Sequence, residues 1–136
     1  MSNKEINKIK SNLLIWVGIL GMLAVVLGAF GAHVLKEKLS ITHLSTFKTG
    51  VMYHFYHVLA LFCVVIYHQL IPSKYVRWAG ICFIIGIFLF SGSLYLLSTR
   101  DILGITNYKW LGPITPIGGL FFIFGWLLLF FSAIRK

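Results

Sequence analysis

Residues 13–35 read LLIWVGILGMLAVVLGAFGAHVL, 23 residues without an aspartate, glutamate, lysine or arginine. The hydrocarbon core of a bilayer is about 30 Å thick, and an α-helix crosses it with about 20 residues. The apolar part of a cleaved signal sequence is shorter, about 7–15 residues. We therefore expect residues 13–35 to form an uncleaved transmembrane helix.

Three further apolar runs of similar length follow, at residues 51–71, 78–99 and 111–134. None alternates with the period of two of a membrane β-barrel, so backbone hydrogen bonding in lipid requires helices. The links are short, which makes neighbouring helices antiparallel. The sequence predicts an all-α, integral membrane four-helix bundle with up-down-up-down topology, forming a single transmembrane domain over residues 1–136. Apolar residues at near-helical spacing over 39–48 predict either an interfacial helix or an early start of the second span.

The composition supports a membrane protein. Of the 136 residues, 59% are hydrophobic and 11% charged, against roughly 45–50% and 25% in soluble domains. A soluble chain this small has too little interior to bury so much apolar surface. The net charge of +9 does not indicate a nucleic-acid partner, because the basic residues flank the apolar runs instead of forming one patch. The expected surroundings are the lipid bilayer.

The basic residues also predict an orientation. Seven lie on the side of the two chain ends: Lys4, Lys8, Lys10, Lys74, Arg77, Arg135 and Lys136. Five lie on the other side: Lys36, Lys38, Lys48, Arg100 and Lys109. The more basic side of a membrane protein faces the cytoplasm. We therefore expect both termini to be cytoplasmic.

Polar side chains concentrate in the half of the bundle that this orientation places outside. Tyr53, His54 and His57 fall within an arc of ~100° on one helix face. Polar groups inside a membrane are costly, and their convergence in an apolar bundle predicts a pocket. The candidate pocket residues are His33, Lys48, Tyr53, His54, His57, Ser91, Ser93, Tyr95, Arg100 and Thr115. Their cations and histidines favour a small anionic ligand or a lipid headgroup.

Several of these residues can also be explained by helix packing or by their position at the membrane interface, without a ligand. His54 and His57 could form hydrogen bonds between helices, which only hold the bundle together. His33 and Arg100 end their spans, where side chains reach the interface at little cost.

Small residues allow helices to pack closely in a membrane. We expect this role for Gly18, Gly21, Gly28, Gly86, Gly118 and Gly125. Tryptophans are typical of the aromatic belt at the membrane interface, and we expect that position for Trp16, Trp78, Trp110 and Trp126.

Several kinds of chemistry lack the residues that they need. Glu5, Glu37 and Asp101 all lie outside the four spans, so a carboxylate proton relay has no candidate. A zinc site needs three or four ligands. The outer half offers only the cluster His33, His54 and His57, which is divided between two helices. No serine–histidine–acid set or nucleotide fingerprint is visible. We predict no metal, no cofactor and no catalytic residue.

Four strings carry a family resemblance. They are Gly28-Ala-Phe-Gly-Ala-His33, Phe47-Lys-Thr-Gly-Val-Met-Tyr-His54, Ser91-Gly-Ser-Leu-Tyr95 and Gly112-Pro-Ile-Thr-Pro-Ile-Gly-Gly119. With them the chain resembles the YwdK/YgdD family of small bacterial membrane proteins, related to eukaryotic transmembrane protein 256. The resemblance implies a multi-pass protein of the bacterial inner or plasma membrane. It implies no activity, because the family is a domain of unknown function.

Three functions remain open on the sequence. The first is a binding or transport module that uses the polar pocket, and four helices are few enough that a transporter would need to be a homo-oligomer. The second is a structural or assembly partner whose glycine-rich faces dock another membrane protein. The third, ranked last, is a membrane enzyme with His54 or His57 as general base, since no nucleophile or orienting acid accompanies them.

Overall fold

The structure is a computed structural model that describes residues 2–134, apart from the side chains of residues 3, 6 and 10. Over that range the regular elements are all helical, and η marks a π-helical segment. They are α1 (Asn3–Phe30), η1 (Gly31–Leu35), α2 (Lys36–Lys38), α3 (Ile41–Leu70), α4 (Lys74–Gly86), η2 (Ile87–Ser91), α5 (Gly92–Leu103) and α6 (Leu111–Ile134). The side chain of Lys10, and Arg135 and Lys136, which contribute to the predicted charge bias, lie outside the described part.

Four helical stretches in the described residues are long and apolar enough to cross a membrane. They are Asn7–Lys38, Ile41–Leu70, Lys74–Leu103 and Leu111–Ile134. Residues 39–48 form no separate helix, because α3 begins at Ile41 and continues to Leu70 without a break. The third span consists of α4, the π-helical segment η2 and α5, which follow one another without a break.

Local sequence signals fix the helix ends. The side chain of Ser40 accepts a hydrogen bond from the backbone amide of His43 at the start of α3. The side chain of Ser73 does the same for the amide of Tyr75 at the start of α4. These serines satisfy amides that have no partner within the helix. Gly104 ends α5 with a φ of 64°, a left-handed conformation that glycine adopts without steric cost.

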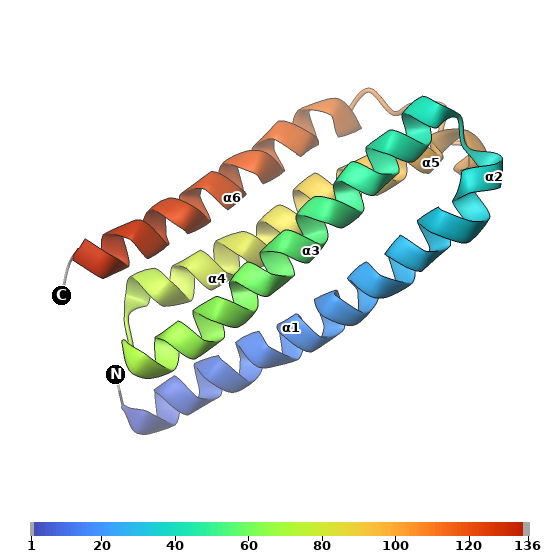
Figure 1. The fold of residues 1–136 in the computed structure, drawn as a ribbon. Coiled ribbons are helices and arrows are strands. Elements are labelled where there is room, and N and C mark those ends of the chain that lie inside the picture. The colour runs from blue at the N-terminus through green and yellow to red at the C-terminus, as the bar shows by residue number, and fades with distance from the viewer. Residues whose placement is uncertain (1, 135–136) are drawn as a thin grey trace.

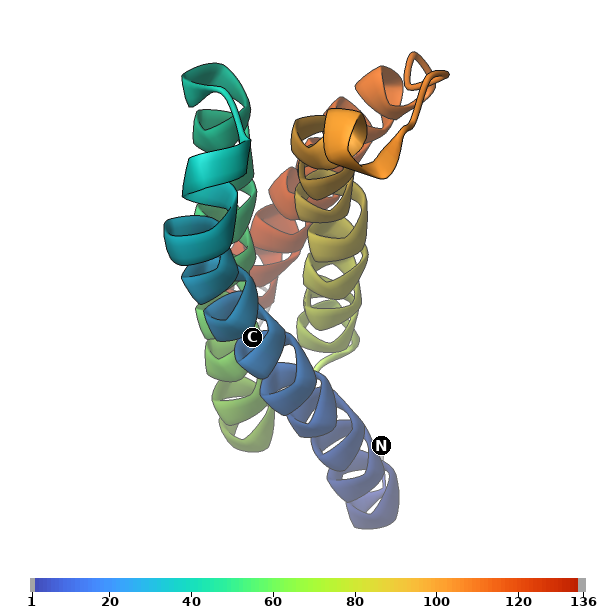
Figure 2. The same ribbon diagram turned by 90° about the vertical axis from the view of Figure 1, so that its right-hand side faces the viewer.

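The helices pack side by side along their length. Figure 1 shows the start of α1, the end of α6 and the α3–α4 link at one end, which we call the terminal end. The short helix α2 and the α5–α6 link lie at the opposite end, which we call the α2 end. Helix α1 packs chiefly on α3, while α4 packs on both α3 and α6. At the α2 end, the start of α3 and the end of α5 lie on opposite sides of the molecule (Figure 2).

The buried core lies where α3 and α4 meet. Apolar side chains with at most 2% of their surface exposed come from both helices and include Leu61, Val64, Val65, Val76, Ala79 and Phe83. Most of the outward-facing surface is apolar as well, as a lipid solvent requires. The lipid-facing and core-facing positions are therefore alike in hydrophobicity.

Glycines allow α6 to approach its neighbours closely. A Cβ atom at Gly118 would collide with the backbone of Phe90 in η2, and one at Gly125 would lie 2.5 Å from the Phe83 ring. A Cβ atom at Gly86 would likewise collide with the ring of Phe122. Rings and backbone thus fill the space that the missing side chains leave.

The glycines of α1 are less tightly packed. A Cβ atom at Gly21 or Gly28 would make an ordinary contact, 3.5 Å from a valine of α3. A Cβ atom at Gly18 would meet no other atom within 4 Å. In this chain Gly18 therefore faces the outside of the bundle.

Candidate functional site

The ring of Tyr95 lies on a strip of α3 formed by Phe47, Gly50 and His54. Its centroid is 5.0 Å from that of Phe47, and its hydroxyl oxygen is 3.0 Å from Nδ1 of His54. A Cβ atom at Gly50 would be 2.9 Å from the Tyr95 ring, so only glycine leaves room for it. The spacing of these α3 residues, three and four positions apart, places them on one helix face. Tyr95 and His54 therefore form one polar pair between α5 and α3.

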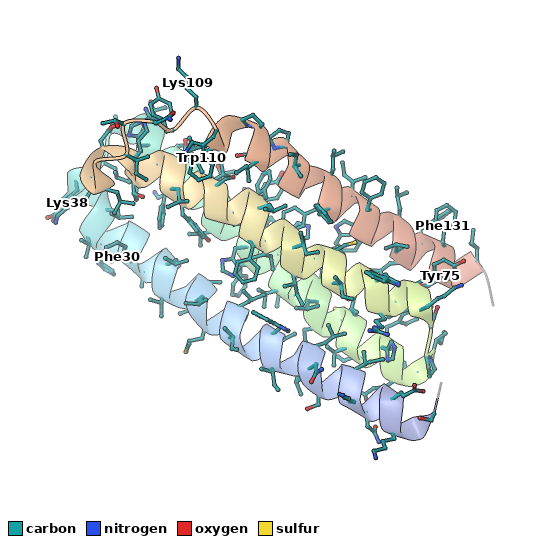
Figure 3. The ribbon with its side chains drawn as sticks, turned by 180° about the vertical axis from the view of Figure 1, so that it is seen from behind. Phe30, Lys38, Tyr75, Lys109, Trp110 and Phe131 are labelled. Atoms are coloured by element: carbon teal, nitrogen blue, oxygen red, sulfur yellow. The ribbon has the colours of Figure 1, made fainter. Side chains whose placement is uncertain are left out.

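A groove of about 290 Å³ lies beside this pair, towards the α2 end. Its lining comes from α1, η1, α2, α3 and α5, and comprises Leu27, Phe30, Val34, Leu35, Lys38, Phe47, Tyr95, Thr99, Ile102 and Leu103. Figure 3 shows Phe30 and Lys38 at the same end of the molecule as Lys109 and Trp110, away from Tyr75 and Phe131. We call this cavity the Tyr95 groove. Its wall is apolar except at Lys38, Tyr95 and Thr99.

The polar groups of the wall differ in whether they already have a hydrogen-bond partner. The Tyr95 hydroxyl is paired with His54, and the Thr99 hydroxyl donates to the Tyr95 backbone carbonyl at 2.7 Å. The Lys38 ammonium makes no hydrogen bond or ion pair in the part of the chain that the structure describes. Lys38 is therefore the wall residue with unused polar capacity.

His57 occupies a separate site near the middle of α3. Its Nδ1 atom is 2.8 Å from the Tyr53 carbonyl oxygen, and its Nε2 is 3.4 Å from the indole nitrogen of Trp126 in α6. A carbonyl only accepts and an indole N–H only donates, so His57 is neutral with its proton on Nδ1. The ring stacks on Phe122 with centroids 3.5 Å apart. Both ring nitrogens are thus engaged, Nδ1 within α3 and Nε2 in the contact that joins α3 to α6.

The serine and threonine candidates form a third group, between α5 and α6. The Ser93 hydroxyl donates to the Phe90 carbonyl at 2.9 Å, and its oxygen is 2.6 Å from that of the Thr115 hydroxyl. Thr115 must then be the donor of the second bond, because the only hydroxyl proton of Ser93 is already engaged. The hydroxyl of Ser91 is fully buried and has no hydrogen-bond partner in the described residues.

The charged candidates lie at the surface. Arg100 donates to the Leu97 carbonyl, lies 3.6 Å from the Asp101 carboxylate and covers the Tyr108 ring. His33 and Lys48 are exposed. The ten predicted residues are therefore divided among a Tyr95–His54 pair, a His57 site with Tyr53, a Ser93–Thr115 pair, the buried Ser91 and separate surface positions. They do not line one common cavity.

Sequence reasoning missed two residues that matter to this geometry. The sequence predicts an interfacial position for Trp126, but its indole donates to His57 near the middle of the bundle. The sequence indicates only a topology signal at Lys38, but Lys38 lines the Tyr95 groove. The available signals were the position of Trp126 well inside its span and the place of Lys38 directly after the first span. No group of three or more histidine, cysteine, aspartate or glutamate side chains suited to a metal ion occurs among the described residues.

Comparison with known proteins identifies relatives along most of the chain. Residues 27–119 match the family model described as "Protein of unknown function (DUF423)". The UPF0382 membrane protein YwdK of Bacillus subtilis is 44% identical over 115 residues, covering 84% of this chain and 89% of the relative. The UPF0382 inner membrane protein YgdD of Escherichia coli K12 is 35% identical over 123 residues, covering 90% and 89%. No solved structure matches the chain significantly.

These relatives confirm the predicted family, and together with the four apolar helices they confirm a multi-pass protein of the bacterial cell membrane. The family model covers all four strings and every residue that lines the Tyr95 groove. The fourth string, Gly112–Gly119, ends with the matched segment. The chain belongs to the DUF423 family of bacterial membrane proteins.

Proposed function

We propose that this protein is a membrane-embedded binding module whose ligand occupies the Tyr95 groove. The ligand class is a single-chain amphiphile with an anionic head, such as a fatty acid. The observation that carries the proposal is the combination, in one cavity, of an apolar wall and an unpaired cation at Lys38.

The chemistry of the wall supports this class of ligand. Because Tyr95 and Thr99 already have hydrogen-bond partners, the wall offers an apolar chain a surface with few unsatisfied polar groups. The cavity of about 290 Å³ lies at the lower limit for small-molecule sites, which is enough for part of one acyl chain. A carboxylate or phosphate beside the Lys38 ammonium would gain a charge-assisted hydrogen bond.

We further propose that the four helices cross the bilayer up and down with both termini in the cytoplasm. The predicted bias of basic residues supports this orientation, and it would place the Tyr95 groove near the outer surface. A ligand would then enter from the outer leaflet, beside Ile102 and Leu103, which are 47% and 57% exposed. The proposal is one of binding, because the described cavity supplies no continuous passage along the bundle axis.

Native mass spectrometry with a palmitate-saturated sample tests the binding proposal. Leu103→Trp should fill the groove and reduce the bound fraction about tenfold, because the ligand loses its cavity. The matched control is Leu120→Trp, the same substitution at an exposed site of α6 outside the groove, and it should bind like the unaltered protein. Equal palmitate binding by both variants would overturn the proposal.

Charge provides a second arm of the same experiment. Lys38→Gln should weaken palmitate binding, whereas Lys36→Gln, an exposed neighbour in α2 that does not line the groove, should not. Neither substitution should alter the binding of palmitate methyl ester, which carries no charge. A common loss in both lysine variants would indicate only a general surface-charge effect and would contradict the proposed headgroup contact.

A second candidate function is assembly with another membrane protein through α1. The observation that favours it is the open face of α1, where a Cβ atom at Gly18 would meet no other atom within 4 Å and Met22 and Val25 are 61% and 62% exposed. Small residues on such a face allow a second helix to pack closely. Disulfide or photochemical cross-linking from position 18 in intact membranes should trap one reproducible neighbour, and labelling of lipid alone would count against this candidate.

A further inference from the structure

We infer that a second lipid site lies at the terminal end, in the groove between α1 and α4, and that it takes an anionic phospholipid. Two adjoining hollows of about 250 and 190 Å³ form this groove and share Ile9, Asn12 and Arg77. We call it the Arg77 groove. It lies at the other end of the bundle from the Tyr95 groove and shares none of its lining residues.

The Arg77 groove changes from polar to apolar along its length. Its outer hollow is lined by Glu5, Lys8, Ile9, Asn12 and Arg77. Its inner hollow adds Leu13, Trp16, Ile81 and Ile84. From Lys8 to Trp16 the helix advances ~12 Å, and Trp16 ends the groove with its ring edge-on to Phe88, 5.9 Å between centroids. A headgroup at the cationic end and an acyl chain at the apolar end match this gradient.

The outer hollow contains two cations, Lys8 and Arg77, and one carboxylate, Glu5. In residues 2–134, no ion pair reaches Lys8 or Arg77. The Glu5 carboxylate accepts a hydrogen bond from the Ser2 amide at 2.8 Å. Hydrogen bonding to Ser2 lowers the pKa of Glu5, with a smaller contribution from the charge of Arg77. Lys8 and Arg77 come from facing helices, and the amide side chain of Asn12 lines the same hollow. These three side chains are suitable hydrogen-bond donors for a phosphate diester.

A buried histidine lies close to the same cation. His68 of α3 is fully buried, and neither of its ring nitrogens has a hydrogen-bond partner in the described residues. Arg77 is near enough to interact with it electrostatically. His68 lines neither hollow, so the polar donors of the proposed site are Lys8, Asn12 and Arg77.

The decisive comparison is lipid retention by purified protein exchanged into equal parts of phosphatidylglycerol and phosphatidylcholine with identical chains. Native mass spectrometry should show preferential retention of phosphatidylglycerol. In the Lys8→Gln/Arg77→Gln variant the preference should fall roughly fivefold for each lost charge. The control is Lys36→Gln/Lys109→Gln, which removes two charges at the α2 end and should retain the preference. Equal loss in both double variants, or no preference in the unaltered protein, would overturn the inference.

Two further arms test the form of the ligand. Ile84→Trp should displace phosphatidylglycerol by filling the apolar hollow while keeping both cations. Inorganic phosphate should compete poorly, because it lacks an acyl chain, and full displacement by it would show an anion site instead of a lipid site.

If Lys8→Gln/Arg77→Gln lowers the melting temperature, Arg77→Lys provides the test in a folded protein. This variant must keep the preference for phosphatidylglycerol, because it keeps the charge. Palmitate binding in the Tyr95 groove should be unchanged by every variant here.

Discussion

The hydroxyl oxygen of Tyr95 lies 3.0 Å from Nδ1 of His54, so a side-chain hydrogen bond joins α5 to α3 at the wall of the Tyr95 groove. Tyr95→Phe removes the hydroxyl and leaves the aromatic ring on Gly50. We expect it to lower the free energy of unfolding by about 0.6–2 kcal/mol, because one interhelical bond is lost and the buried His54 loses its partner. Unfolding by SDS in mixed micelles measures this change.

A double-mutant cycle isolates that bond. His54→Phe and Tyr95→Phe should together cost less than the sum of the single changes, since both remove the same interaction. Strict additivity would mean that the two side chains do not interact in the folded protein.

His57 should be a neutral histidine with its proton on Nδ1. That tautomer follows from its contacts with the Tyr53 carbonyl and the Trp126 indole. Nitrogen-15 NMR of histidine-labelled protein distinguishes the two ring nitrogens. Trp126→Phe keeps an aromatic side chain but removes the donor, so the Nε2 resonance should shift. An Nε2-protonated ring in the unaltered protein would contradict this assignment.

Gly118 and Gly119 are neighbours on α6 with opposite expected responses to alanine. A Cβ atom at Gly118 would collide with the backbone of Phe90, whereas one at Gly119 would lie 3.8 Å from the Phe90 ring. Backbone cannot move aside as a side-chain tip can, so Gly118→Ala should cost about 1–3 kcal/mol or more. Gly119→Ala should be neutral or slightly stabilising, since alanine favours helix more than glycine does. Thermal unfolding in detergent compares the two variants, and equal melting temperatures would argue against close packing of α6 on η2.

Orientation can be tested with single cysteines. After Cys63 and Cys82 are replaced by serine, a cysteine at Asp101 should react with a membrane-impermeant maleimide added to intact cells. A cysteine at Lys74, at the terminal end, should react only after lysis. The reverse pattern would place the Tyr95 groove on the cytoplasmic side.

The sequence predicted the helices better than it predicted their contacts. Hydrophobic length located the spans, because length and composition are local signals. The rotation of each helix about its axis is not local when lipid-facing and core-facing positions are both apolar. Trp126 was therefore assigned to the interface, although it contacts His57 inside the bundle.

The candidate pocket illustrates the same limit. Depth in the membrane correctly suggested that Tyr95 and His54 lie at one level, and they form a hydrogen bond. Depth does not tell which side of a helix faces which neighbour, so His57, Ser93 and Arg100 were grouped with them but have partners of their own. A ligand role for any of these residues stays a prediction.

Photochemical labelling in intact membranes tests the proposed binding function most directly. A fatty acid with a diazirine at the end of its chain would be supplied to cells, activated by light and located by peptide mapping. The proposed function predicts label concentrated on residues that line the Tyr95 groove, such as Phe47 and Leu103, with loss of that label when unmodified palmitate is in excess or when Leu103 is replaced by tryptophan. Label spread evenly over the exposed faces of α1 and α6, and insensitive to excess palmitate, would contradict it.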